Sequence, residues 1–205
     1  MSRRRIAQGI VALLVVAGAV YWRQTITADP KLRFTAFNKV NWADQDGAAT
    51  PEGITRQEKD GGTQFDVAFV SGKRVFVDLG LRNAGSRGVR IDQVPATGFY
   101  YFGFDTMEVS PDVRAGIGAA TSYEPFKPFT LAAGEARNVR LVFRMAECGP
   151  TPTDRQAGTT TIHGLVLRYK ILGIGRAWLA PFDKSALGVA TVGNCEHPIS
   201  EPTGS

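Results

Sequence analysis

The chain has 205 residues, of which 43% are hydrophobic and 10% aromatic, and this composition argues against wholesale disorder. Its formal net charge of +5 invites comparison with nucleic-acid-binding proteins. However, Arg3, Arg4 and Arg5 precede the first apolar run, so 21 of the 24 basic residues remain against 19 acidic ones. Because those basic residues are scattered along the chain, we expect no nucleic-acid partner.

Residues 6–22, IAQGIVALLVVAGAVYW, carry no charged side chain. As a helix they would span roughly 25 Å, near the lower limit for crossing a bilayer. Three arginines precede the segment and only Arg23 follows it closely, which places the N-terminus in the cytoplasm by the positive-inside rule. Residues 1–22 are therefore predicted to be a basic stub and a single-pass membrane anchor, with the rest of the chain extracytoplasmic.

A cleaved signal peptide is the alternative for the same segment. Small residues at 17–19 (AGA) or 26–28 (ITA) would serve as its cleavage site. Tyr21 and Trp22 favour the uncleaved signal anchor, because aromatic side chains gather at membrane interfaces. Both alternatives deliver the remaining residues outside the cytoplasm.

Residues 23–63 have the glycine, proline and acidic content of a tether or loop. From residue 64 to residue 195 the apolar side chains recur with a period of two, which predicts a domain of antiparallel strands. In RVFVDLGLRN, residues 74–83, the side chains of Val75, Val77, Leu79 and Leu81 share one face. The residues NAG at 83–85 are typical of a turn and end the strand.

Further strands are expected along the rest of this domain. VRIDQVP follows the first turn, an aromatic strand comes next, and a long loop rich in glycine, proline and serine runs from residue 110 to the FTL strand at 129–131. Val139, Leu141, Phe143 and Met145 of the next strand are predicted to face inward, with Arg140 and Arg144 in water. A hairpin with its turn near residues 173–175, a last strand (ALGVATV) and a flexible tail at 196–205 complete the chain.

The aromatic strand at 99–104, FYYFGF, has aromatic side chains on both faces. Because only one face of a half-buried strand meets the core, something must cover Tyr100, Phe102 and Phe104. The cover is either internal, from Phe34 and Phe37 or from Phe126 and Phe129, or a protein partner. On the second alternative Tyr100, Phe102 and Phe104 are the candidate partner-binding residues.

The runs VFVDLGLRNAGSRGVRI and FTLAAGEARNVRLVF resemble the early strand pair and the Gly-Glu turn of bacterial exported immunoglobulin-like modules. The resemblance covers residues 74–192 and implies an all-β, two-sheet sandwich on an envelope protein. The chain departs from antibody-type domains because it lacks their Cys…Trp…Cys spacing. The resemblance carries no catalytic residue across.

Export places the two cysteines, Cys148 and Cys195, in an oxidising compartment, where an even count predicts a disulfide. The alternative is two unpaired, buried thiols. Met145 is near Cys148 in sequence and His197 is near Cys195. If the two cysteines lie together, these four side chains would form a set of ligands suited to copper. A disulfide would consume both thiolates, so we expect no metal.

No motif for catalysis emerges from the remaining residues. His163 and His197 are the only histidines, His163 is expected at the rim of a core strand, and no G-x-S-x-G motif is present. The acidic run from Asp44 fails the calcium-loop pattern, because its sixth and twelfth positions hold Ala49 and Thr55.

The sequence therefore predicts a non-enzymatic, membrane-anchored protein of a bacterial cell envelope that needs no cofactor and interacts with or assembles with another envelope protein. A secreted carrier of a ligand or of copper is the alternative.

Overall fold

The computed structural model describes residues 12–22, 31–35, 39–45, 51–59, 62–99, 102–112, 120, 122–148, 161–183 and 186–192. Residues 12–22 form a helix, and nearly all other regular structure in these ranges is β-strand, as the sequence predicts. The strands are β1 (Leu32–Phe34), β2 (Lys39–Trp42), β3 (Ile54–Lys59), β4 (Gly62–Ala68), β5 (Arg74–Asn83), β6 (Val89–Gln93), β7 (Thr97–Phe99), β8 (Phe102–Val109), β9 (Glu124–Pro125), β10 (Phe129–Leu131), β11 (Ala136–Met145), β12 (Thr161–Ile162), β13 (Gly164–Ile171), β14 (Ile174–Pro181) and β15 (Ala186–Val192).

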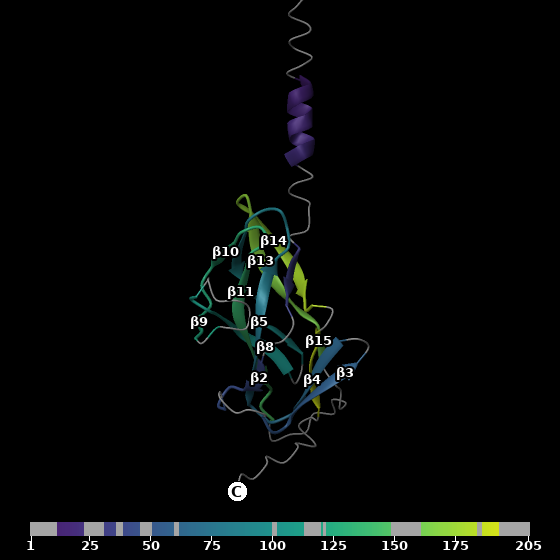
Figure 1. The fold of residues 1–205 in the computed structure, drawn as a ribbon, viewed down its shortest axis with the longest axis vertical. Helices are drawn as coiled ribbons and strands as arrows, with labels where there is room; N and C mark the ends of the chain where they lie inside the picture. The colour runs from purple at the N-terminus through teal and green to yellow at the C-terminus, as the bar shows by residue number, and fades with distance from the viewer. Residues whose placement is uncertain are drawn as a thin grey trace, which may run out of the picture.

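These strands form three sheets (Figure 1). The largest has the order β1-β5-β11-β8-β7, with β2 also paired to β5 and β9 to β8. The other two have the orders β10-β6-β13-β14 and β12-β15-β4-β3. Neighbours in the described strands are antiparallel except β15 and β4, which run parallel.

The pair β5 and β11 forms the centre of the largest sheet, in a register that places Val77 opposite Leu141 and Leu79 opposite Val139. All eight side chains predicted to face inward from these strands are fully buried. Alternation of apolar and polar residues thus identified both strands correctly, because a period of two puts every second side chain on one face.

One hydrophobic core joins the three sheets. It contains Phe34, Leu79 and Phe143 from the largest sheet, Ile91 and Leu167 from the second, and Val67 and Val189 from the third, all of them buried. His163 lies between β12 and β13, so the chain passes there from the third sheet into the second.

The prediction that residues 23–63 are a tether is wrong for its described part. β1 and β2 pair with β5, and β3 pairs with β4. Phe34 and Trp42 are buried in the core; Phe37 lies outside the described residues. Strands of three and four residues are too short for a period of two to stand out among glycine and proline.

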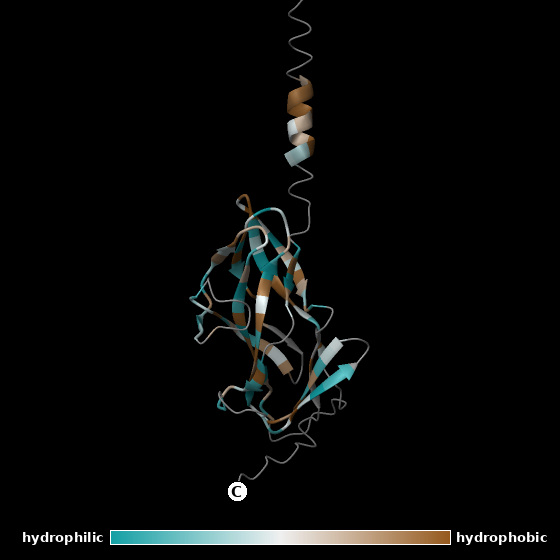
Figure 2. Ribbon diagram, in the orientation of Figure 1, coloured by the Kyte–Doolittle hydropathy of each residue, from teal (hydrophilic) through white to brown (hydrophobic). Residues whose placement is uncertain are grey.

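The helix of residues 12–22 stands beyond one end of the β-sheet domain in Figure 1, and Figure 2 shows most of it in the hydrophobic colour. It covers the C-terminal part of the predicted membrane segment; residues 6–11 lie outside the described ranges. Within those ranges, no helix is both long enough and apolar enough to span a membrane.

Candidate functional site

The outer face of the β10-β6-β13-β14 sheet carries the candidate site. Along β13 the side chains of Leu165, Leu167, Tyr169 and Ile171 are buried, and Arg168 and Lys170 between them are exposed. This alternation points the two cations away from the core.

A hollow of about 580 Å³ lies on this face. In the register of β13 and β14, Gly175 stands opposite Lys170 and Ala177 opposite Arg168. Because glycine and alanine have little or no side chain, the sheet surface beside the two cations stays uncovered, and a Cβ added at Gly175 would meet only open space. The hollow is lined by Asp92, Gln93, Arg168, Tyr169, Lys170, Gly175, Arg176 and Ala177.

The charges around the hollow do not cancel. Asp92 receives hydrogen bonds from Lys170, whose Nζ lies 2.9 Å from Oδ2, and from Arg90, whose Nε lies 2.8 Å from Oδ1. The bond from Lys170 and then that from Arg90 lower the pKa of Asp92, so this carboxylate is ionised at neutral pH. Among the described residues, the side chain of Arg168 has no hydrogen bond or ion pair. Among the residues that line the hollow, Arg168, Lys170 and Arg176 stand against the single carboxylate of Asp92, which leaves two uncompensated positive charges.

An apolar strip borders the cationic hollow. Leu179, whose exposed fraction is 61%, stands directly across from the half-buried Val166. The face as a whole therefore offers guanidinium and ammonium groups for an anion and, next to them, an apolar surface. Serine, cysteine and histidine are missing from the described residues that line it.

The aromatic strand does not provide the expected partner surface. Phe102 and Phe104, at 0% and 4% exposure, lie in the core; Tyr100 is outside the described residues. Phe102 stacks on Phe143 with 5.3 Å between ring centroids, and Phe104 meets the same ring edge-on at 6.0 Å. The prediction that these two side chains bind a partner is therefore wrong. Gly103, between them, has no side chain. The sequence therefore shows no polar residue on the outer face here, and the usual alternation of apolar and polar residues could not be recognised.

A second prediction fails at Arg140, which was expected in water. Its Nε and Nη2 donate hydrogen bonds of 2.7 and 3.0 Å to the two carboxylate oxygens of Asp78. The guanidinium carbon lies 3.7 Å from the ring centroid of Phe76 and 4.5 Å from that of Tyr123. The side chains of Arg140 and Asp78 are only 16% and 10% exposed. Aromatic residues thus cover an ion pair on the outer face of the largest sheet, whereas Arg144 is exposed as predicted.

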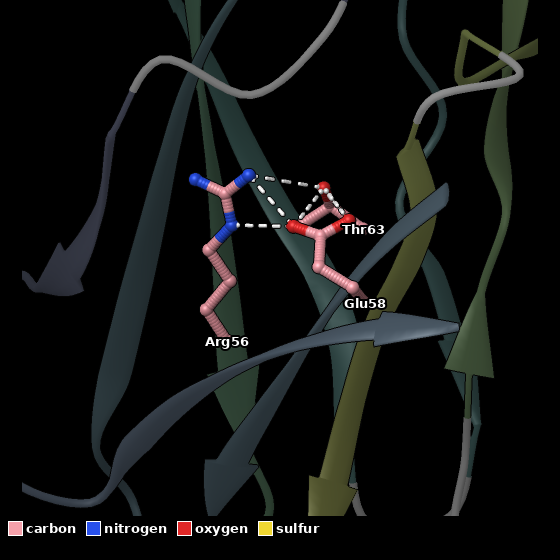
Figure 3. Close-up of polar contacts among 3 residues, drawn as sticks. All are labelled: Arg56, Glu58 and Thr63. Atoms are coloured by element: carbon pink, nitrogen blue, oxygen red, sulfur yellow. Dashed lines mark hydrogen bonds and ion pairs between the residues drawn. The ribbon is translucent and has the colours of Figure 1, made fainter. Parts of the chain in front are cut away.

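A third polar cluster, formed by Arg56, Glu58 and Thr63, lies on the hairpin of β3 and β4 (Figure 3), with the side chains of Arg56 and Glu58 exposed. Glu58 stands opposite Thr63 in the register, accepts a hydrogen bond of 3.0 Å from its hydroxyl, and forms an ion pair of 2.7 Å with Arg56. The hydrogen bonds from Arg56 and then Thr63 lower the pKa of Glu58. Its three members bond one another, so the cluster helps to fix the register of the hairpin.

The sequence candidates for metal binding are not brought together. Met145 is fully buried and its sulfur accepts the N–H of Val70 at 3.0 Å; Cys195 and His197 lie outside the described residues. His163 is exposed rather than packed at a core rim. Asp44 forms an ion pair of 3.8 Å with Lys73. In the part of the chain that the structure describes, no three His, Cys, Asp or Glu side chains are grouped to hold a metal ion.

Cys148 is disulfide-bonded and therefore carries no free thiol. Its predicted partner, Cys195, is the only other cysteine of the chain but lies outside the described residues, so the pairing stays a prediction. Unreduced, denatured protein is expected to take up no thiol-specific polyethylene-glycol label, and reduced protein to take up one label per cysteine, measured by gel shift. Labelling without reduction would contradict the bridge.

Neither protein-family models nor curated proteins match this sequence, so no residue role is carried over from a relative.

Proposed function

We propose that the chain is a membrane-anchored, extracytoplasmic β-sandwich of the immunoglobulin-like type, acting as a non-enzymatic interaction component of a bacterial cell envelope. The shared core of the three sheets supports a sandwich. The observation that carries the interaction role is the hollow on the β6-β13-β14 face, where Arg168 has no ionic partner among the described residues.

The composition of the N-terminal segment supports the anchor. Leu13, Leu14, Val15 and Val16 are each more than 60% exposed on the helix and do not belong to the described hydrophobic core. Contiguous exposed apolar side chains of this kind are unfavourable in water and favourable in a bilayer. The arginines at 3–5 orient the helix so that the β domain lies outside the cytoplasm.

The chemistry of the hollow defines the partner. Arg168 and Lys170 present donors for carboxylates, and Leu179 with Val166 presents an apolar surface beside them. An acidic protein segment that also carries apolar side chains satisfies both parts of this face. The two uncompensated positive charges raise the rate of encounter with such a segment.

The charge reversal Arg168→Glu tests this function. We expect the variant to bind a fluorescein-labelled peptide of alternating glutamate and leucine about tenfold more weakly, or more, because each lost charge-assisted hydrogen bond contributes about 1.5–3 kcal/mol. Fluorescence anisotropy of the full-length protein in detergent micelles measures the dissociation constant.

Arg56→Glu is the matched control, since it makes the same change of net charge at an exposed arginine on β3. It is expected to leave peptide affinity within about twofold of the original, because charges farther apart than roughly 10 Å are screened at physiological salt. An equal loss in both variants would mean that the peptide senses only net charge and would contradict the hollow as a binding site.

A further inference from the structure

Exposed apolar side chains in the described β domain are concentrated on one hairpin. Outside the helix, the large hydrophobic residues that are exposed in the described ranges are Leu172 (53%), Ile174 (36%) and Leu179 (61%), all from the β13–β14 hairpin. Leu179 borders the hollow, whereas Leu172 and Ile174 form the tip of the hairpin. The tip therefore has an apolar surface of its own, distinct from the hollow.

The backbone at the tip holds Leu172 in a conformation that leucine rarely adopts. Leu172 has φ 51° and Gly173 has φ 82°, so both residues of this two-residue turn are in the left-handed region. Asparagine, aspartate and glycine adopt that conformation most easily, and a leucine there is unfavourable both for the backbone and for its exposed side chain. Strained positions of this kind concentrate where a side chain makes a functional contact.

The tip points toward the helix. In Figure 1, β13 and β14 run along the long axis of the domain, and their turn lies at the end nearest residues 12–22. The β5–β6 turn lies at the same end, where Arg87 donates a hydrogen bond of 3.0 Å to the Tyr21 hydroxyl and stands 5.7 Å from the centroid of its ring. This contact ties that end of the domain to the last turn of the helix.

We propose that the β13–β14 tip, Leu172 with Ile174, inserts into the interfacial layer of the membrane that holds the helix. The inference rests on the proposed anchoring, because Tyr21 and Trp22 then mark the interface and Arg87 holds the domain at that depth. The hollow is on the side of the sheet, so a protein segment still reaches it.

Photo-crosslinking of the full-length protein tests the insertion. The variant Leu172→p-benzoylphenylalanine is reconstituted in nanodiscs of phosphatidylethanolamine and phosphatidylglycerol and irradiated. Mass spectrometry of the tip peptide is expected to show lipid adducts. The control, Gln57→p-benzoylphenylalanine, lies exposed on β3 at the end of the domain away from the helix (Figure 1). It is expected to yield about tenfold less lipid adduct, or lower, because it is out of reach of the bilayer.

The variant Ile174→p-benzoylphenylalanine repeats the measurement from the neighbouring tip residue should the first variant fail to fold, as circular dichroism would reveal. Resistance to alkaline carbonate extraction from cell membranes reports separately on the anchor. A carbonate-resistant protein without lipid adducts at either tip position would overturn the insertion and leave the anchor intact. Adducts only to a second copy of the chain would also overturn it. A chain released by carbonate would overturn both proposals.

Discussion

The substitution Asp78→Ala is expected to lower the free energy of unfolding by about 3–5 kcal/mol. It removes the carboxylate that accepts hydrogen bonds from Nε and Nη2 of Arg140, while the guanidinium remains covered by Phe76 and Tyr123. Removing the carboxylate takes away both of these charge-assisted hydrogen bonds, so part of the desolvation cost of the covered guanidinium is no longer offset. Urea unfolding of the full-length protein, followed by circular dichroism, measures the loss.

The exposed pair of Arg144 and Glu147 provides the matched control. Its nitrogen–oxygen distance is 2.6 Å, comparable with that of the buried pair, but the two side chains are 47% and 74% exposed. Glu147→Ala is therefore expected to cost about 0–1 kcal/mol. The double variant Asp78→Leu with Arg140→Met should regain most of the stability that Asp78→Ala loses, because an apolar pair needs no compensation. A loss below 1 kcal/mol for Asp78→Ala would contradict the burial of this pair.

Removing the Phe102 ring is the second change with a large expected effect. Phe102→Ala should lower the free energy of unfolding by about 3–5 kcal/mol, because it leaves a cavity against Phe143 in the closed core. Urea unfolding again gives the value.

Thr106→Ala serves as the control for this strand, since Thr106 is exposed on β8. Its effect is expected to stay within about 0.5 kcal/mol. Near-normal stability of Phe102→Ala would mean that the ring is not buried in the core and would again make it a candidate for partner binding. The same pair of variants thus distinguishes a core residue from an interface residue without knowledge of any partner.

The longest strands that the sequence identified share one property, an alternation of apolar and polar residues over their whole length. β5, β11 and the β13–β14 hairpin each have eight or ten residues, enough for a period of two to be read reliably. The buried faces of β5 and β11 followed directly from that period. β1 and β2, with three and four residues, offer one or two repeats, so their pairing with β5 depends on tertiary contacts that no local pattern encodes.

The candidate site was beyond sequence reasoning for a different reason. Arg168 and Lys170 are visible as polar residues on a core strand, but two solvent-facing cations on a strand are unremarkable. The hollow arises only because the register sets Gly175 and Ala177 beside them and leaves space. The covered ion pair of Arg140 had only one local signal in the sequence. Phe76 shares the outer face of its strand with the charged residues Arg74 and Asp78, where a polar side chain is expected.

The parallel pairing of β15 with β4 sets an order in which the chain can fold. β3 and β4 are neighbours in sequence and can pair as soon as both have been synthesised, but the strand that completes their sheet begins at Ala186, more than a hundred positions later. Contacts between such distant segments form slowly, because the intervening chain must first be closed into a loop. Until the C-terminal strand arrives, the backbone groups on one side of β4 have no partner and remain available to other unpaired strands.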